Sequence, residues 1–143
     1  MRYFALLIGL AIVISGCSSV VYQKTELYQA YNDYRTETNR DNVIALAPKF
    51  FTPKLLGSDY ASKAYTVDFL LFKDSISDET SHFEKRMAGG GCLTINGLNN
   101  DELVIINLGY KHINQHWLID RIHLVYDENK PADQAFCPGE FSY

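Results

Sequence analysis

Two aspartates inside apolar stretches are the best candidates for acid–base chemistry in this sequence. Asp68 interrupts the stretch AYTVDFLLF, and Asp120 interrupts HWLIDRIHLVY. A carboxylate inside an apolar concavity has a raised pKa and can act as a general base. In the competing interpretation, Asp120 lies near a sheet edge, or it pairs with Arg121 or Lys111 in solvent, which is the commoner role of a strand aspartate. Catalysis is therefore a hypothesis that needs a pocket, and Trp117 is a further candidate to line one.

The histidines and consecutive glycines do not form a metal or phosphate site. His112 and His116 flank a predicted turn, where they would oppose each other across a hairpin. A zinc site needs three or four protein ligands, so we expect surface histidines and no metal. Residues 89–91, all glycine, lack the lysine and the following helix of a phosphate-binding loop. They indicate a sharp bend or a close backbone approach, and we expect no cofactor.

Cys92 and Cys137 are expected to form a disulfide if the chain is exported, because the exported side of a membrane is oxidising. The crosslink would close a loop of about 45 residues, which corresponds to roughly 4 kcal/mol of stabilisation before any strain is subtracted. The alternatives are two free buried thiols or a metal pair. Neither cysteine lies in a CxxC motif or near a ligand-spaced histidine, so metal binding is the weaker alternative.

The remaining cysteine, Cys17, follows the only long apolar run of the chain, FALLIGLAIVI at residues 4–14. Arg2 precedes this run and small residues follow it, which is the layout of a secretory signal. The run is shorter than the about 20 residues that cross a bilayer. Residues 14–17, Ile-Ser-Gly-Cys, resemble the lipobox of bacterial lipoproteins. The alternative is an ordinary signal peptide with an incidental cysteine.

The lipobox resemblance implies both processing and location. Residues 1–16 would be removed as a signal peptide, and Cys17 would become the lipidated first residue of the mature protein. Several acyl chains hold a protein to a membrane, since each buried methylene contributes about 0.8 kcal/mol. Ser18 follows the cysteine in place of Asp, which by resemblance to enterobacterial lipoproteins favours the outer membrane. We expect a tether at 17–24 and a single domain at 25–143, lipid-anchored in the cell envelope and facing the periplasm.

Composition argues against nucleic acid as a partner. The chain has 143 residues and a formal net charge of −4. Cleavage before Cys17 would remove one basic residue, Arg2, and change this charge to −5. Domains that bind nucleic acid carry basic patches, and the sequence contains no basic cluster. An acidic body is attracted instead to a basic protein partner.

The first half of the chain is predicted to be helical and the second half to be mostly strand. An apolar stripe at three- and four-residue steps predicts a helix within residues 25–42, with a buried face that carries Leu27, Tyr31, Tyr34 and Thr38. Shorter helices are predicted at 42–47 and 53–56. Strands are predicted at 64–72, 92–95, 102–112 and 116–126. Residues 73–91 are predicted to be loop leading into a strand, and 96–101 a turn.

This order of elements predicts an α+β fold, in which N-terminal helices pack on a curved antiparallel sheet of about four strands. The helical start, the stretch ALAPKFFTPKLL and the closing HWLIDRIHL resemble the nuclear-transport-factor-2-like, or cystatin-like, cone folds. The resemblance implies a sheet wrapped round a helix, with a pocket at the open end. Enzymes of that group place acid–base residues in this pocket.

Three functions follow from these features, and the sequence favours a non-catalytic one. The first is an envelope lipoprotein that binds a partner protein, for example as an accessory factor or an inhibitor. The second is a carrier that holds a small apolar molecule in a sheet pocket. The third is an isomerase- or dehydratase-like enzyme that uses Asp68 or Asp120. A filled interior with an exposed apolar patch would favour the first, and a pocket with a buried carboxylate the others.

Overall fold

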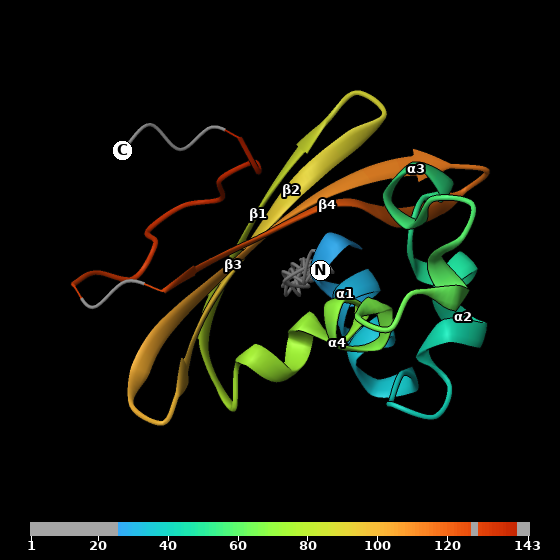
Figure 1. The fold of residues 1–143 in the computed structure, drawn as a ribbon. Helices are drawn as coiled ribbons and strands as arrows, with labels where there is room; N and C mark the ends of the chain where they lie inside the picture. The colour runs from blue at the N-terminus through green and yellow to red at the C-terminus, as the bar shows by residue number, and fades with distance from the viewer. Residues whose placement is uncertain (1–25, 127–128, 140–143) are drawn as a thin grey trace, which may run out of the picture.

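The computed structural model describes residues 26–126 and 129–139. These residues form a layer of helices packed against a four-stranded antiparallel sheet (Figure 1), which confirms the predicted α+β class. The helical elements are α1 Glu26–Glu37, α2 Val43–Phe50, α3 Pro53–Leu56, η1 Tyr60–Ser62, α4 Thr66–Leu70 and η2 Phe72–Ser75. The strands are β1 Asp78–Met87, β2 Gly90–Asn99, β3 Glu102–Ile113 and β4 His116–Tyr126.

The sheet is a meander in which every strand pairs with its neighbour in sequence, in the order β1-β2-β3-β4. The predicted hairpin of β3 and β4 is confirmed. Its turn contains Asn114 and Gln115, both with positive φ, and the β2–β3 turn contains Asn100 and Asp101 in the same conformation. Asn and Asp tolerate this left-handed backbone better than other residues with a side chain, which is why these polar pairs reverse the chain.

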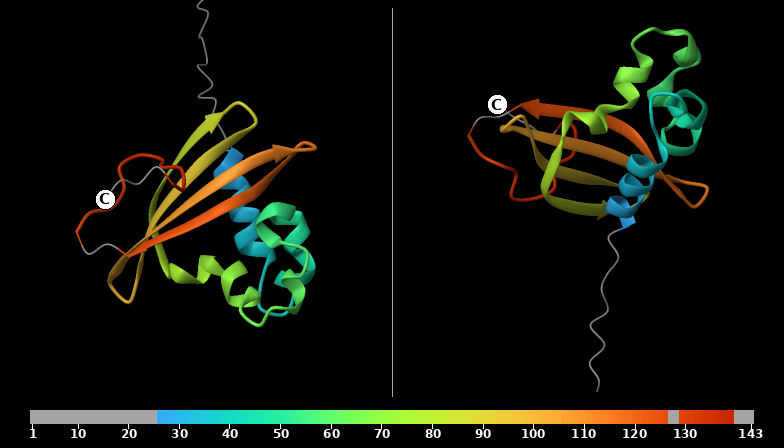
Figure 2. Two further views of the ribbon diagram at one scale, coloured as in Figure 1. Left: turned by 45° about the horizontal axis from the view of Figure 1, so that its top comes forward. Right: turned by 90° about the horizontal axis from the view of Figure 1, so that it is seen from below.

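The two faces of the sheet are covered by opposite ends of the described chain. Helix α1 lies across one face, and the segment 129–139 crosses the other (Figures 1 and 2). Gly91 of β2 lies under α1, because a Cβ built there would be 2.7 Å from Leu27 Cδ1. The predicted close approach at the glycine stretch is therefore confirmed, and it lets α1 pack directly on β2.

The space between α1 and the sheet is filled with side chains. The predicted buried stripe of α1 is confirmed, with Leu27, Tyr31, Tyr34 and Thr38 all buried. They pack against α2, the α4–η2 segment and the inner face of the sheet, where the fully buried residues include Leu93, Ile95, Ile106, Leu108 and Ile119. Burial of these apolar side chains is the main force that holds the helical layer on the sheet.

The prediction of a strand at 64–72 is wrong, since these residues form α4 and the start of η2. Aromatic and β-branched residues favour strands only when a neighbouring strand is available to pair with. Here Thr66 and Leu70 are buried one helical turn apart, while Tyr65 and Phe69 are exposed. The segment is helical because its buried side chains are spaced four residues apart, whatever their type.

The prediction of loop at 73–91 is also wrong, because most of this segment is strand β1. Its charged and polar composition suits an edge strand, where charges discourage pairing with other molecules. Strand β2 likewise runs past the predicted turn at Asn96 and Gly97 and ends at Asn99. Asn96 is buried and bonded to the C-terminal segment, so its polar side chain has a partner inside the fold.

Candidate functional site

A cleft of about 630 Å³ lies between α1 and the β3–β4 hairpin. We call it the Trp117 cleft. One wall is a stripe along α1, and the other is the hairpin end with Trp117, the only tryptophan in the sequence. Its lining comprises Glu26, Gln29, Ala30, Asp33, Glu37, Lys49, Phe50, His112, Gln115, His116 and Trp117. Of the three predicted pocket residues, only Trp117 lines this cleft.

Hydrogen bonds and ring contacts hold the cleft walls in place. The Trp117 indole donates to Glu26 Oε2 at 3.3 Å, and the ring centroids of Trp117 and His112 are 4.4 Å apart. At the other end Lys49 pairs with Glu37. The cleft is open to solvent and mixes charged with aromatic groups, so it could hold a polar aromatic molecule or an extended peptide.

The predicted opposition of His112 and His116 is wrong by one residue. His112 faces Trp117 across the hairpin, and His116 faces Ile113. The two-residue turn at Asn114 and Gln115 fixes this register. Among residues 26–126 and 129–139, no group of three or more His, Cys, Asp or Glu side chains could hold a metal ion.

A second candidate surface lies on the helical layer around α4. Tyr65 and Phe69 are 63% and 42% exposed, which is high for aromatic side chains. They border a hollow of about 190 Å³ that also involves Leu56 and Tyr60. Leu56 and Tyr60 in turn line an adjoining hollow of about 450 Å³. We call these residues the α4 surface; exposed aromatic side chains beside apolar hollows are typical of protein interfaces.

The sequence interpretation missed Tyr65 and Phe69 because it assigned them to a strand, where one of two alternating faces is normally buried. The signal that could have found them is the spacing of Thr66 and Leu70. If these two residues form the buried face of a helical turn, Tyr65 and Phe69, also four apart, must share the adjacent face and point toward solvent.

Asp68 does not lie in an apolar concavity. It is exposed on α4 and forms an ion pair with Arg40 at 2.5 Å. Around it is a polar hollow that also contains Asp74 and Tyr126. An exposed carboxylate paired with an arginine lacks the apolar surroundings that a general base of this kind needs.

Asp120 is 7% exposed, but its environment is polar. The register of β3 and β4 shifts between Gly109 and Tyr110, so Asp120 forms a bulge opposite them. Its Oδ1 accepts a hydrogen bond from Thr52 Oγ1 at 2.9 Å and lies 3.5 Å from Lys111 Nζ. The sequence alternative of pairing with Lys111 agrees with this geometry. Asp120 fastens the Thr52 segment to the edge of β4 and lines none of the hollows described above.

A third polar cluster joins α1 to β1 around Glu79. This carboxylate accepts from Arg35 at 3.0 Å and lies 3.1 Å from His82 Nδ1. The ring of Tyr28 stacks on His82 with centroids 3.5 Å apart, and burial together with hydrogen bonding to Glu79 raises the pKa of Tyr28. These contacts hold α1 on β1.

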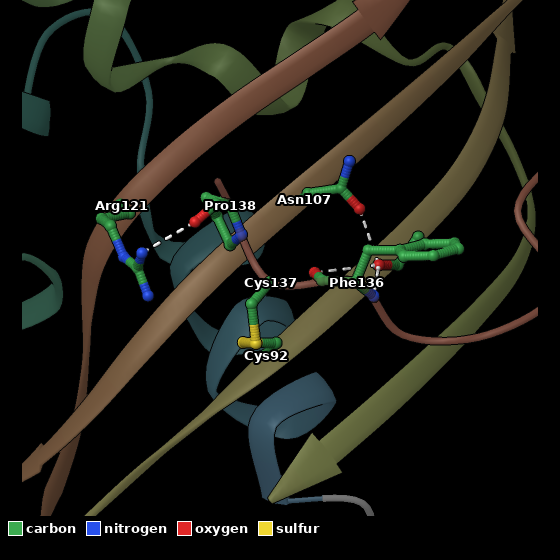
Figure 3. Close-up of a disulfide and its surroundings, with 7 residues drawn as sticks. Cys92, Asn107, Arg121, Phe136, Cys137 and Pro138 are labelled. Atoms are coloured by element: carbon green, nitrogen blue, oxygen red, sulfur yellow. Dashed lines mark hydrogen bonds between the residues drawn. A yellow bond between two sulfur atoms is a disulfide. The ribbon is translucent and has the colours of Figure 1, made fainter. Parts of the chain in front are cut away.

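The predicted Cys92–Cys137 disulfide is present and fastens the C-terminal segment to the outer face of the sheet (Figure 3). Polar side chains of the sheet bind the backbone of this segment. Asn96 both donates to and accepts from Ala132, at 2.8 and 2.9 Å, and Phe136 N–H donates to Thr94 Oγ1 at 2.8 Å. Two buried polar residues of this face, Thr94 and Asn96, therefore bind the C-terminal segment of the chain itself.

Arg121 completes the attachment, because its guanidinium donates to the Pro138 carbonyl at 2.7 Å (Figure 3). Cys17, the predicted lipid site, and the predicted tether at 17–24 lie outside the described residues. Within the described ranges, no helix is long and apolar enough to span a bilayer. Compared with protein-family models, with curated proteins and with solved structures, the chain matches none. The resemblance to the nuclear-transport-factor-2-like cone fold stays a prediction.

Proposed function

We propose that this protein is a lipoprotein anchored through Cys17 to the periplasmic side of a bacterial outer membrane, where it binds a partner protein without catalysis. The anchor is supported by the lipobox-like sequence at residues 14–17. The binding role is supported by one observation above others, which is a filled interior combined with the exposed aromatic side chains of the α4 surface.

The filled interior weakens the carrier and enzyme hypotheses. A carrier needs an enclosed apolar cavity that buries most of its ligand, whereas the space between α1 and the sheet is occupied by Tyr31, Leu93, Leu108 and their neighbours. An acid–base enzyme needs a carboxylate beside such a cavity. Asp68 is paired in solvent, and Asp120 is bonded to Thr52 and Lys111.

The α4 surface has the composition of a docking site for a protein. Interface energy is concentrated in a few aromatic anchors that fill pockets. Tyr65 and Phe69 border one apolar hollow, which adjoins a second hollow through Leu56 and Tyr60. Asp68 on α4 and Asp74 on η2 lie nearby and form ion pairs with Arg40 and Lys73, and Lys63 lines the hollow itself, so the rim carries charges of both signs. This pattern supports the accessory or inhibitor role and a partner with an apolar centre and a polar rim.

Metabolic labelling with palmitate tests the anchor. The wild-type chain should take up label and sediment with outer membranes, and the Cys17→Ala variant should do neither. Label of equal strength in the variant would overturn the assignment of the lipid site. Ser18→Asp provides a second test, because by the sorting rule it should move the labelled protein to the inner membrane.

Site-specific photocrosslinking in intact cells tests the docking surface. A benzophenone side chain at position 69 should capture one protein reproducibly, and the same group at Thr80, exposed on β1, should not. In a detergent extract without the crosslinking group, the captured protein should bind Tyr65→Ser with Phe69→Ser about 2–4 kcal/mol more weakly than it binds the wild-type chain, the range for lost aromatic anchors. Met87→Ser removes an exposed apolar side chain elsewhere and serves as the control. Equal binding of the captured protein by the Tyr65→Ser, Phe69→Ser double variant and by the Met87→Ser control would refute the proposed surface.

The Trp117 cleft supports a second candidate function, the binding of a small molecule. Its volume of about 630 Å³ lies within the range of ligand pockets. Because Trp117 is the only tryptophan, intrinsic fluorescence reports on this cleft alone. Saturable quenching by a periplasmic metabolite fraction would favour this function if it is lost in Trp117→Phe with Tyr126→Trp, which carries the reporter outside the cleft. An unchanged spectrum would count against it.

A further inference from the structure

The two hairpin turns at one end of the sheet lie side by side, next to the start of α1. His112 N–H donates to the Gly89 carbonyl at 3.0 Å, which joins the β1–β2 turn to the end of β3. Arg86 at the end of β1 pairs with Glu26, the first residue of α1, at 2.8 Å. Figure 2 shows both turns at the end of the sheet where α1 begins. We call this end of the domain the tether-side end.

The tether-side end exposes apolar and basic side chains together. Met87 and Ile113, on the two turns, are 46% and 37% exposed. Lys85, Arg86 and Lys111 are exposed beside them. The carboxylates near these cations are Glu26, paired with Arg86, the half-buried Glu84, which accepts from Tyr28 N–H, and Asp120, buried below Lys111. Apolar side chains ringed by lysine and arginine are the pattern of surfaces that lie against lipid headgroups.

The opposite end of the domain has the opposite charge. The β2–β3 turn and the segment that leads into β1 expose five carboxylates, on Asp68, Asp74, Asp78, Asp101 and Glu102. The cations that face them are Arg40 and Lys73, which pair with Asp68 and Asp74. A protein of net charge −4 therefore has a charge gradient along the sheet, and an anionic membrane attracts only the tether-side end.

The length of chain before α1 brings the same end to the membrane. Residues 18–25 separate Cys17 from Glu26, and even when fully extended this stretch spans only roughly 30 Å. Strand β3, with 12 residues, is about 40 Å long. The start of α1 is thus always close to the anchor, while the acidic end approaches the bilayer only if the domain folds back on its tether.

We propose that the tether-side end docks on the phospholipid surface of the membrane that holds the anchor, with Met87 and Ile113 among the headgroups. This inference rests on the proposed lipid anchor. In this orientation the acidic end, which includes Asp68 of α4, faces away from the bilayer, where a soluble or opposing partner can reach it. Docking thus gives the domain one defined orientation at the membrane.

Fluorescence quenching by headgroup-labelled lipid tests the orientation. The lipidated mature chain is reconstituted into vesicles of phosphatidylcholine and phosphatidylglycerol that contain a headgroup spin-labelled lipid. Trp117, which lies at the tether-side end, should be quenched strongly. A second reporter, Trp117→Phe with Tyr126→Trp, places the indole at the acidic end and should be quenched several-fold less.

Charge reversal shows whether the basic side chains cause this orientation. Lys85→Glu changes the charge by two units, and each unit near an anionic surface is worth about fivefold in binding. The equilibrium constant for docking should therefore fall by roughly 25-fold, with loss of Trp117 quenching. Lys54→Glu on α3 gives the protein the same net charge and should keep the Trp117 quenching. High salt should mimic Lys85→Glu, because it screens exposed charges.

Two results would overturn the inference: equal quenching of the two reporters, or the same quenching in Lys85→Glu and Lys54→Glu. Flotation of the vesicles separates this failure from a failure of the proposed anchor. If the protein floats with the vesicles but its two reporters are quenched equally, it has an anchor and no docked orientation. A protein that does not float has neither.

Discussion

Removal of the disulfide is expected to release the C-terminal segment and to destabilise the whole domain. The perturbation is the double variant Cys92→Ala with Cys137→Ala, which deletes the crosslink and leaves small side chains in a buried site. The hydrogen bonds from Asn96, Thr94 and Arg121 to the segment remain available in this variant. The experiment therefore asks whether these bonds hold the segment without a covalent link.

The magnitude follows from loop length and chain entropy. The disulfide joins residues separated by 45 positions, and a loop of that size is worth about 4 kcal/mol. The free segment would have to order about ten residues at 1–2 kcal/mol each. Its few hydrogen bonds contribute only about 0.5–1.5 kcal/mol apiece. We expect the segment to detach, and the free energy of unfolding to fall by about 4 kcal/mol.

Urea denaturation and hydrogen exchange measure the two parts of this prediction. With a denaturant slope of about 2 kcal/mol per molar, the urea midpoint should fall by roughly 2 M. The amide protons of Ala132 and Phe136, which donate to Asn96 and Thr94, should lose their protection from exchange. Wild-type protein under reducing conditions is the control and should match the variant. A midpoint shift below about 0.5 M, with both amides still protected, would refute the reasoning.

Three further predictions follow from buried groups. Burial raises the pKa of Tyr31, Tyr34 and Tyr110 above the ordinary value of 10.0. Above about pH 10 the unfolded state therefore loses protons that the folded state keeps, and the free energy of unfolding should fall by about 1.4 kcal/mol per pH unit for each tyrosine. A urea midpoint that is unchanged between pH 9 and about 11 would contradict this prediction. Gly91→Ala should destabilise by about 1–3 kcal/mol in thermal unfolding, because the new Cβ would lie 2.7 Å from Leu27 Cδ1 and 2.8 Å from a backbone oxygen; a wild-type melting temperature would show that α1 can move away. Asp120→Ala should lower the free energy of unfolding by about 1–3 kcal/mol. The double variant with Thr52→Val should lose less than the sum of the two single variants. Strict additivity would mean that the hydrogen bond between these side chains contributes nothing.

The parts of the fold that the sequence predicts well are those in which one residue pattern has one structural solution. The stripe of α1 repeats at helical spacing over three turns, and β3 and β4 are long apolar runs joined by an Asn-Gln turn. The disulfide was predictable because only two cysteines remain beside the proposed lipid site. In each case the local preference and the tertiary environment agree.

The segments that were predicted wrongly are those in which tertiary surroundings outweigh composition. Strand β1 is polar because it lies at the sheet edge, and its pairing partner β2 supplies the apolar side. The segment at 64–72 is aromatic because two of its rings form a surface and not because they pack in a sheet. Asn96 and Thr94 look like turn or surface residues, but they bind the backbone of a segment about 40 positions away.

The candidate site was only partly predictable for a related reason. Trp117 was identified by its type, but the cleft that it lines depends on how α1 crosses the hairpin. Asp120 was identified by its apolar neighbours in sequence, and a bulge then turned it toward Thr52. A single-residue change in register reverses which face a strand side chain occupies, and bulges are not visible in the residue pattern.

The covering of both faces of the sheet has a consequence for the order in which the domain matures. The meander of β1 to β4 can pair as soon as its own residues are available, but its outer face stays open until Cys137 meets Cys92, 45 positions away. Oxidation of the two thiols is therefore the step that closes the outer face, and a domain whose meander has already formed would still have that face uncovered before this step.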